Sequence, residues 1–235
     1  MCFLMYKMHK YPSEIIRYVV ILYHRYCLSL RDISEILLYR NIEVSYESNR
    51  KWNKKFGRII ANNIRSKRQY APQDKWHLDE MRVVIGGEVF WLYWAIDSNG
   101  EELDIFLQNR RNTKAVKRFF KKLLKRCGFV PKTIATDKLK SYVSAKRHIL
   151  KSTEHRKHKR LNNLIENSHQ PTRQKERLMR KFKDPGATQL FLSSCDQYLN
   201  LLKVGRYKFR AENYRQKMKA AFALYNEATS VHYNA

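Results

Sequence analysis

The sequence predicts an α/β protein, in which a mixed sheet with flanking helices follows a smaller all-α segment. The apolar residues recur with a helical period in the first part of the chain and then change to the alternating, aromatic-rich pattern of strands. Of the 235 residues, 43% are hydrophobic and 13% are aromatic. This content suffices for a core, so a wholly disordered chain is excluded.

The all-α segment is expected to contain three helices. Pro12 opens the first, Ser29 can cap a short second helix, and Ser45 can cap a third. The third helix carries four candidate DNA-binding residues: Arg50, Lys51, Lys54 and Lys55. Two helices joined by a short turn, the second of them basic, are typical of a helix-turn-helix. An ordinary three-helix bundle with a solvated basic face is the alternative.

The following segment predicts an antiparallel meander, with turns at Gly86-Gly87 and at Ser98-Asn99-Gly100. Asn112 is expected to cap an amphipathic helix that ends at Gly128. The predicted strands cover 76–85, 89–96, 103–107 and 133–136, and the later helices cover 139–146, 161–183, 188–203 and 210–228. Three antiparallel strands, a helix, a strand and a helix are the order expected of a ribonuclease-H-like fold.

The predicted organisation has four parts. A helix-turn-helix domain covers 1–64, and a polar, basic linker that contains Pro72 covers 65–74. A ribonuclease-H-like catalytic domain covers 75–205, and a C-terminal helical extension covers 206–235.

The net charge indicates a nucleic-acid partner. The chain has 48 Lys and Arg against 21 Asp and Glu, a formal charge of +27 that attracts polyanions. The basic residues are spread along the chain and do not line one amphipathic helix, which argues against a membrane surface. Four distant cysteines without a CxxC pattern indicate a reducing compartment and no structural zinc, and no signal peptide is visible. We therefore expect a cytoplasmic, nucleoid-associated protein.

Three carboxylates stand out because acids are scarce in this chain. Asp79 lies mid-strand in WHLDE, Asp137 ends a short strand in IATDKLKSY, and Glu166 lies in the helical LNNLIENSHQPTR. Mg²⁺ prefers oxygen ligands, and two such ions can activate an attacking oxygen and stabilise a leaving one in phosphoryl transfer. These residues are therefore the predicted catalytic and metal-binding set.

The surroundings of this set carry further expectations. On a helix, Glu166, His169 and Arg173 share one face, which would bring the Arg173 cation to a DNA phosphate. Pro171 predicts a kink in that helix, and Glu80 should face away from Asp79.

Other acidic and histidine residues receive structural assignments. Asp97 and Asp104 are expected to form the turn around Ser98-Asn99-Gly100. His155 and His158 could be a ligand pair, but a solvated basic loop is the favoured interpretation, because no Cys or further His completes a zinc set.

The quoted strings, together with GxxxWLYWAID, LDIFLQNRRN and RYCLSLRDISEIL, resemble DDE transposases of bacterial insertion sequences, most closely those of family six. The resemblance covers nearly the whole chain. It implies that Asp79, Asp137 and Glu166 hold two Mg²⁺ or Mn²⁺ ions and that Arg173 is the basic residue after the triad. The chain departs from the family in having Trp94 where Arg is usual, and Asn49 and Asn53 where apolar residues are usual.

The activity implied is cleavage of DNA at the element ends and joining of the freed 3′ hydroxyl to target DNA. The expected partners are double-stranded DNA, as terminal inverted repeats and as target, and at least one further copy of the chain. The apolar residues from Thr188 onward are candidates for contact between copies: Leu190, Phe191, Leu192, Tyr198, Leu199 and Leu202. The alternatives are a decayed copy that binds element ends as a repressor and a nuclease that acts on RNA–DNA hybrids.

Overall fold

The computed structural model describes residues 5–7, 9–137, 140–157, 163–205 and 209–230. By packing, the chain forms two compact units. One unit contains Tyr70–Ser193, and the other contains Met1–Gln69 together with Ser194–Ala235. The unit Tyr70–Ser193 contains the β-sheet and therefore determines the fold class.

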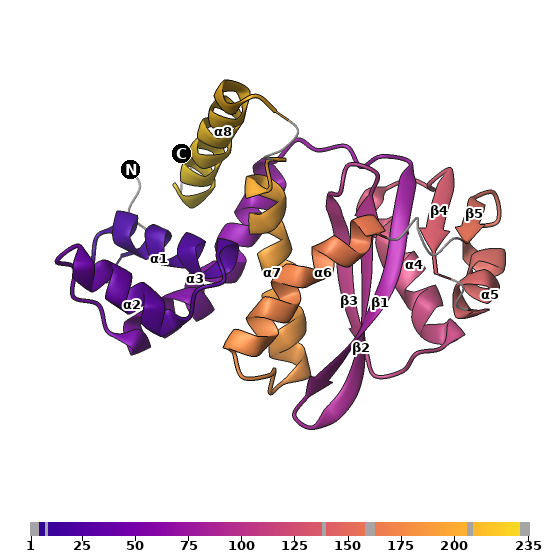
Figure 1. Ribbon diagram of the computed structural model, residues 1–235, viewed down its shortest axis with the longest axis horizontal. Helices are drawn as coiled ribbons and strands as arrows, with labels where there is room; N and C mark the ends of the chain where they lie inside the picture. The colour runs from indigo at the N-terminus through magenta and orange to yellow at the C-terminus, as the bar shows by residue number, and fades with distance from the viewer. Residues whose placement is uncertain (1–4, 8, 138–139, 158–162, 206–208, 231–235) are drawn as a thin grey trace. The chain divides into compact units, whose positions relative to one another are not determined.

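Five strands form one mixed sheet in the order β3-β2-β1-β4-β5 (Figure 1). The strands β1, β2 and β3 pair antiparallel, whereas β4 and β5 run parallel to β1. Their bounds are Lys75–Ile85 for β1, Glu88–Asp97 for β2, Glu102–Gln108 for β3, Thr133–Thr136 for β4 and Glu154–Lys157 for β5. This topology confirms the ribonuclease-H-like fold.

Helices cover both faces of the sheet because the side chains of β1 alternate between two cores. Trp76 and Leu78 pack with the apolar stripe of α4 (Thr113–Cys127) and with α5 (Lys140–Ile149). On the other face, Met81 and its odd-numbered neighbours pack with Ile165 of α6 and Leu192 of α7. The bounds are Asn163–Leu178 for α6 and Pro185–Leu202 for α7.

The strand β5 was not predicted. Its sequence, EHRK, lacks apolar alternation because an edge strand that pairs only with β4 can leave its side chains in solvent. His155 therefore lies in a strand and not in a loop, with its Nε2 atom 2.8 Å from Oγ1 of Thr136. His158 lies outside the described residues.

The helix predicted over 161–183 is shorter in the structure. It includes Pro171 in its interior and ends at Leu178, because Arg180 and Lys181 take up the left-handed backbone conformation. The predicted kink at Pro171 stays a prediction.

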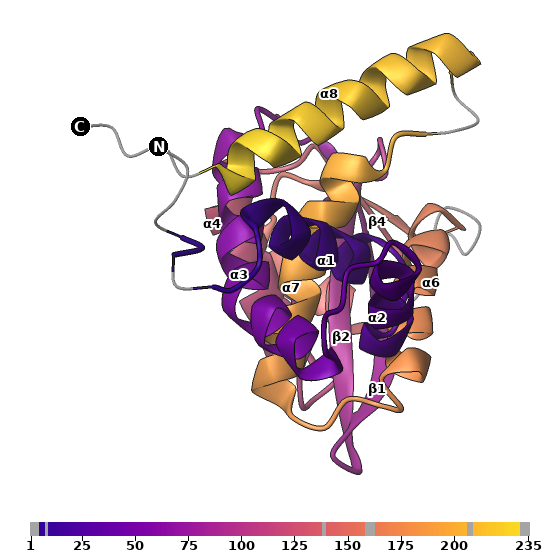
Figure 2. The same cartoon turned by 90° about the vertical axis from the view of Figure 1, so that its left-hand side faces the viewer.

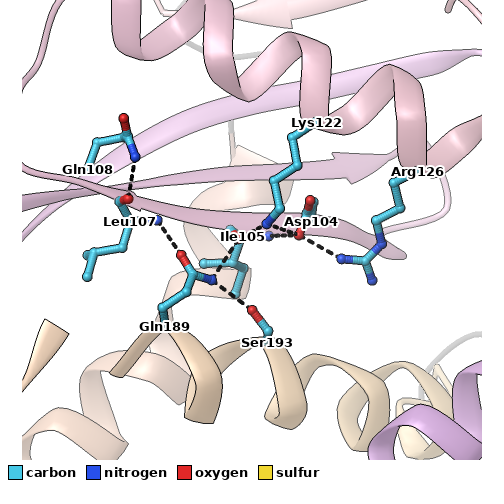
Figure 3. Close-up of polar contacts among 8 residues, drawn as sticks. All are labelled: Asp104, Ile105, Leu107, Gln108, Lys122, Arg126, Gln189 and Ser193. Carbon is cyan, nitrogen blue, oxygen red and sulfur yellow. Dashed lines mark hydrogen bonds and ion pairs between the residues drawn. The ribbon is translucent and has the colours of Figure 1, made fainter. Parts of the chain in front are cut away.

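Asp97 forms the predicted turn, and Asp104 does not. Oδ1 of Asp97 accepts hydrogen bonds from the amides of Asn99 (2.9 Å) and Glu101 (3.0 Å). Asp104 is instead buried, and its Oδ1 atom contacts Nζ of Lys122 at 3.0 Å and Nη1 of Arg126 at 2.6 Å (Figure 3). The two cations lie one turn apart on α4, and that tertiary pairing is invisible in the local turn pattern.

Asp104→Asn is therefore expected to destabilise the protein by about 2 kcal/mol, because a buried carboxylate that neutralises two cations is lost. A urea titration measures the effect as a lower midpoint. Asp74→Asn is the control, since Asp74 pairs at 2.9 Å with a Lys132 side chain that is 85% exposed. An unchanged midpoint for Asp104→Asn would contradict the structural role of this pair.

A glutamine of α7 occupies the outer edge of β3. The amide of Leu107 donates to Oε1 of Gln189 at 2.7 Å, and Nε2 of Gln189 donates to the carbonyl of Ile105 at 3.1 Å (Figure 3). Nε2 also contacts Oγ of Ser193 at 2.7 Å, which fixes the side chain. The side chain thus satisfies backbone groups that would otherwise have no strand to pair with.

The second unit is all-helical and includes α1 (Ser13–Arg25), α2 (Leu30–Tyr39), α3 (Tyr46–Lys67) and α8 (Ala211–Thr229), with the end of α7. The predicted caps form, since Ser29 and Asp32 make a capping box and Ser45 accepts from the amide of Ser48. The helix α3 continues to Lys67, three residues into the predicted linker, because Ile64 still belongs to the buried face.

The helix α8 packs against α3 and completes this core (Figure 2). Nδ2 of Asn63 donates to the carbonyl of Ala228 at 2.9 Å, and Lys67 pairs with Glu227 at 2.6 Å. The described residues from Ser194 onward, which the sequence placed in the catalytic domain and a C-terminal extension, belong to the same compact unit as the N-terminal helices.

The core of this unit contains two unusual features. Asn49 and Asn53 are buried at positions where apolar residues were expected, and Nδ2 of Asn49 donates to Oγ of Ser34 at 2.9 Å, which links α3 to α2. Gly57 lies against the ring of His24, which stacks on Tyr198 at a centroid distance of 4.5 Å.

The expected contact surface on α7 is wrong as a set. Of its six residues only Leu190 is exposed, whereas Leu192, Tyr198, Leu199 and Leu202 are buried. Leu192 belongs to the core of one unit, and Tyr198 and Leu202 belong to the core of the other. In the described part of the chain, no helix combines the length and the apolar character that crossing a bilayer requires.

Candidate active site

Asp79 lies in β1, and Asp137 directly follows the neighbouring strand β4 at the same level. The parallel pairing of β1 with β4 matches His77 with Ala135, and each aspartate follows that pair by two residues. Neighbouring strands are about 4.8 Å apart, so the register brings the two residues together at one end of β4. The Asp79 side chain is 18% exposed, and Asp137 is half-buried. Both carboxylates are thus accessible from solvent at a sheet that is otherwise covered.

The helix α6 covers the face of the sheet on which Asp79 lies. Trp94, the antiparallel partner of Asp79, is fully buried, and its ring lies 5.1 Å from the ring of His169. Nδ1 of His169 is 3.9 Å from Oδ2 of Asp79. Glu166 lies in α6 one turn before His169, and its side chain is outside the described part of the structure. Trp94, which departs from the family pattern, is therefore the platform for a residue of the candidate site.

His169 is uncharged at neutral pH. Burial lowers the pKa of His169 to about 4, and the nearby charge of Arg173 acts in the same direction. The imidazole therefore adds no positive charge beside Asp79.

A buried ion pair lies behind the aspartates, on the opposite face of β1. The Glu80 side chain is fully buried, and its Oε1 atom accepts from Nε of Arg111 at 2.8 Å and also from Nη2. The Arg111 guanidinium stacks on Trp91 at 4.6 Å. Glu80 therefore faces away from Asp79, as predicted.

Charges on the two faces influence one another. Burial raises the pKa of Glu80, the Arg111 hydrogen bond opposes this shift, and the charge of Asp137 adds to it. Burial, followed by the charges of Glu80 and Asp79, raises the pKa of the Tyr142 phenol. Glu80, Arg111 and Tyr142 thus form one electrostatic group with the aspartates. Arg111 and Tyr142 were not predicted as site residues, because their only signal is that they lie in the NRRN and TDKLKSY strings.

The donor set fits a hard divalent cation. Mg²⁺ is commonly bound by one or two carboxylates with waters and substrate phosphate, and Asp79 and Asp137 supply two such groups. Among the described residues, His, Cys, Asp and Glu side chains form no metal-binding group of three or more, and the third predicted ligand is the side chain of Glu166, which is not described. The three-carboxylate metal site therefore stays a prediction.

The predicted DNA-binding residues differ in their availability. Arg50 is held by Glu47 through contacts of 2.8 and 2.6 Å, and Nζ of Lys55 lies 3.1 Å from Nε2 of His9. Lys51 and Lys54 are exposed on α3. Within the described ranges, neither of these two lysines makes a hydrogen bond or an ion pair. Arg173 contacts Glu176 at 3.3 Å and belongs to the other unit.

Comparison with known proteins places the chain among transposases. A family model described as a DDE domain matches residues 73–204. The transposase for the insertion sequence-like element IS431mec of Staphylococcus aureus is 34% identical over 165 residues, which are 68% of this chain and 73% of that protein. The transposase for IS257 in transposon Tn4003 of Staphylococcus aureus gives the same values. The catalytic domain of the Mos1 mariner transposase aligns with a TM-score of 0.43 and 11% identity, over 77% of this chain and 97% of that chain. The chain belongs to the DDE transposases of bacterial insertion sequences.

Proposed function

We propose that this transposase cleaves DNA at the ends of its insertion sequence and joins the freed 3′ hydroxyl to target DNA, with Asp79, Asp137 and Glu166 as the catalytic carboxylates. The observation that carries the proposal is that Asp79 in β1 and Asp137, directly after β4, each lie two residues past the paired His77 and Ala135, with His169 of α6 beside Asp79. Two Mg²⁺ or Mn²⁺ ions held there would activate the attacking oxygen and stabilise the leaving oxygen.

The residues around the carboxylates have supporting roles in this proposal. His169 packs on Trp94 and covers Asp79 on one side without adding a positive charge. On the other face, the buried Glu80–Arg111 pair ties the loop before α4 to β1 at the residue next to Asp79. Both contacts restrain the strand segment that carries the first carboxylate, which is the positioning that phosphoryl transfer requires.

Binding of the element ends is proposed to occur through the N-terminal helices used as a helix-turn-helix. The exposed basic face of α3 and the formal charge of +27 support this proposal. Because two ends must be held together for joining, the active form is proposed to be a dimer or a higher oligomer.

The double variant Lys51→Ala, Lys54→Ala is expected to weaken binding to an element-end duplex. It should also reduce the slope of log K against log salt by about 2, since each phosphate contact releases counterions. Fluorescence anisotropy at several salt concentrations measures both quantities. The control is Arg215→Ala, Lys219→Ala, which removes the same charge from exposed positions of α8. Equal losses in the two variants would show that net charge alone, and not α3, controls the affinity.

The activity itself is tested with a labelled fragment of the element end, in a cleavage assay and a gel shift on the same sample. Wild-type protein should nick the fragment with Mg²⁺ and should bind it without nicking in a chelator. A protein that shifts the fragment and never nicks it with metal present is a repressor. A protein that cuts an RNA–DNA hybrid and not the element end is a nuclease of the same fold.

A further inference from the structure

The chain leaves α6 through two strained residues. Arg180 has φ of 50° and Lys181 has φ of 73°, in the left-handed region that favours glycine. Among the described residues, the one other non-glycine residue with positive φ is Asn41, a residue type that tolerates this conformation. Residues with a longer side chain keep such a backbone only when the surroundings enforce it.

Hydrogen bonds and packing around residues 180–182 hold the backbone of this turn, and they do not require particular side chains at Arg180 and Lys181. The amides of Arg180 and Lys181 donate to the carbonyls of Arg177 (3.0 Å) and Glu176 (2.9 Å). Phe182 is buried, forms a bridge with Ile85, and accepts a hydrogen bond from the amide of Gly86 at 3.1 Å. Glycine would satisfy all these backbone contacts with less strain. The two cationic side chains are therefore unexplained by folding.

Those side chains line an open hollow of about 510 Å³ at the end of α6. Its lining consists of four cations and one acid: Arg173, Glu176, Arg177, Arg180 and Lys181. The acid is already engaged, since Glu176 pairs with Arg173. Arg177, Arg180 and Lys181 are exposed, and in the described part of the chain their side chains make no ion pair or hydrogen bond. Three neighbouring exposed cations create a positive potential that attracts an anionic ligand.

We propose that Arg177, Arg180 and Lys181 form a phosphate-binding site that grips the backbone of duplex DNA at the end of α6. The inference rests on the proposed function, because it takes DNA as the ligand. The site is distinct from Arg173, whose charge is shared with Glu176. It lies at the C-terminal end of the helix that carries Glu166 and His169, so DNA bound there is held by the unit that contains the carboxylates.

The double variant Arg180→Gly, Lys181→Gly tests the site, because it removes both cations and relieves the backbone strain. Its unfolding midpoint should equal or exceed that of the wild type. Its affinity for a 30-base-pair duplex, measured without divalent metal, should fall at least about tenfold at moderate salt, with a salt slope lower by about 2. The charge-preserving variant Arg180→Lys, Lys181→Arg should bind as the wild type does.

The matched control is Lys121→Ala, Lys125→Ala, which removes two exposed cations from α4 on the other face of the sheet. Equal DNA affinities of the glycine variant and this control would overturn the site, and so would a lower unfolding midpoint of the glycine variant. Because binding is measured without cleavage, the two proposals can fail separately. Nicking by the wild type with unchanged binding by the glycine variant overturns only the site. Loss of binding by that variant, with no nicking by the wild type, overturns only the catalytic proposal.

Discussion

Asp79→Asn, Asp137→Asn and Glu166→Gln are each expected to reduce nicking of a labelled element-end fragment by at least about 10²- to 10³-fold. Each substitution keeps the shape of the side chain and removes one charge that would hold a metal ion, and electrostatic stabilisation is the main contribution to phosphoryl transfer. Binding of the fragment should persist, because the loss of a negative charge does not weaken attraction to DNA. A gel shift and a cleavage assay on the same samples measure both effects.

The control for this series must be an acid that has no role in the core. Asp104 cannot serve, because it is buried between Lys122 and Arg126. Asp74→Asn is suitable, since the Asp74 side chain forms an exposed pair with Lys132, and this variant should cleave as the wild type does. A triad variant that still nicks the fragment would show that the wrong carboxylate was assigned.

Gly57→Ala is expected to destabilise the helical unit by about 2–3 kcal/mol, in the upper part of the range for overpacking a filled core. A Cβ atom at this position would lie 2.7 Å from Cε1 and 2.8 Å from Nε2 of His24. The imidazole cannot move away, because it stacks on Tyr198 and its Nδ1 atom lies 3.0 Å from the carbonyl of Val20. In addition, the Tyr198 hydroxyl donates to the carbonyl of Gly57 at 2.9 Å.

Calorimetry or urea titration should show this loss, and Asn62→Ala, an exposed substitution on the same helix, should change stability by only a few tenths of a kcal/mol. A double-mutant cycle isolates the cause. In a His24→Ala background the clash is gone, so Gly57→Ala should no longer destabilise. An equal loss in both backgrounds would mean that steric contact with His24 is not the reason.

The sequence was sufficient where local signals are strong. The helix α4 has a regular apolar stripe, the cap at Asn112 and the left-handed Gly128, and all of them form as predicted. The meander was predicted because Gly86-Gly87 and the Asp97 turn interrupt alternating apolar runs. The sequence also predicted that Asp79 lies within one strand and that Asp137 follows a short one, and those strands, β1 and β4, are neighbours in the sheet.

Long-range polar contacts were beyond the sequence. The Glu80–Arg111 pair joins residues that no periodicity connects, and the same holds for Asp104 and its partners on α4. The strand β5 has no apolar pattern, because its place is decided by the vacant edge of β4. Apolar residues of α7 were misassigned to the surface, since a sequence does not reveal that one helix contributes to two cores.

The contact of Gln189 with β3 has a consequence for damaged copies of the gene. Gln189 lies 82 residues after Leu107 and 84 residues after Ile105. During synthesis, the ribosome therefore completes the edge strand β3 long before it adds the glutamine that covers this edge. A reading frame interrupted between these points would yield a sheet with an open edge, the kind that adds strands from other molecules. Such truncated chains should aggregate and collect in the insoluble fraction. A frameshift between Leu107 and Gln189 should therefore leave no soluble polypeptide that could compete for the element ends. Fractionation of cells that express a chain truncated before Gln189 would show whether that chain is insoluble or soluble.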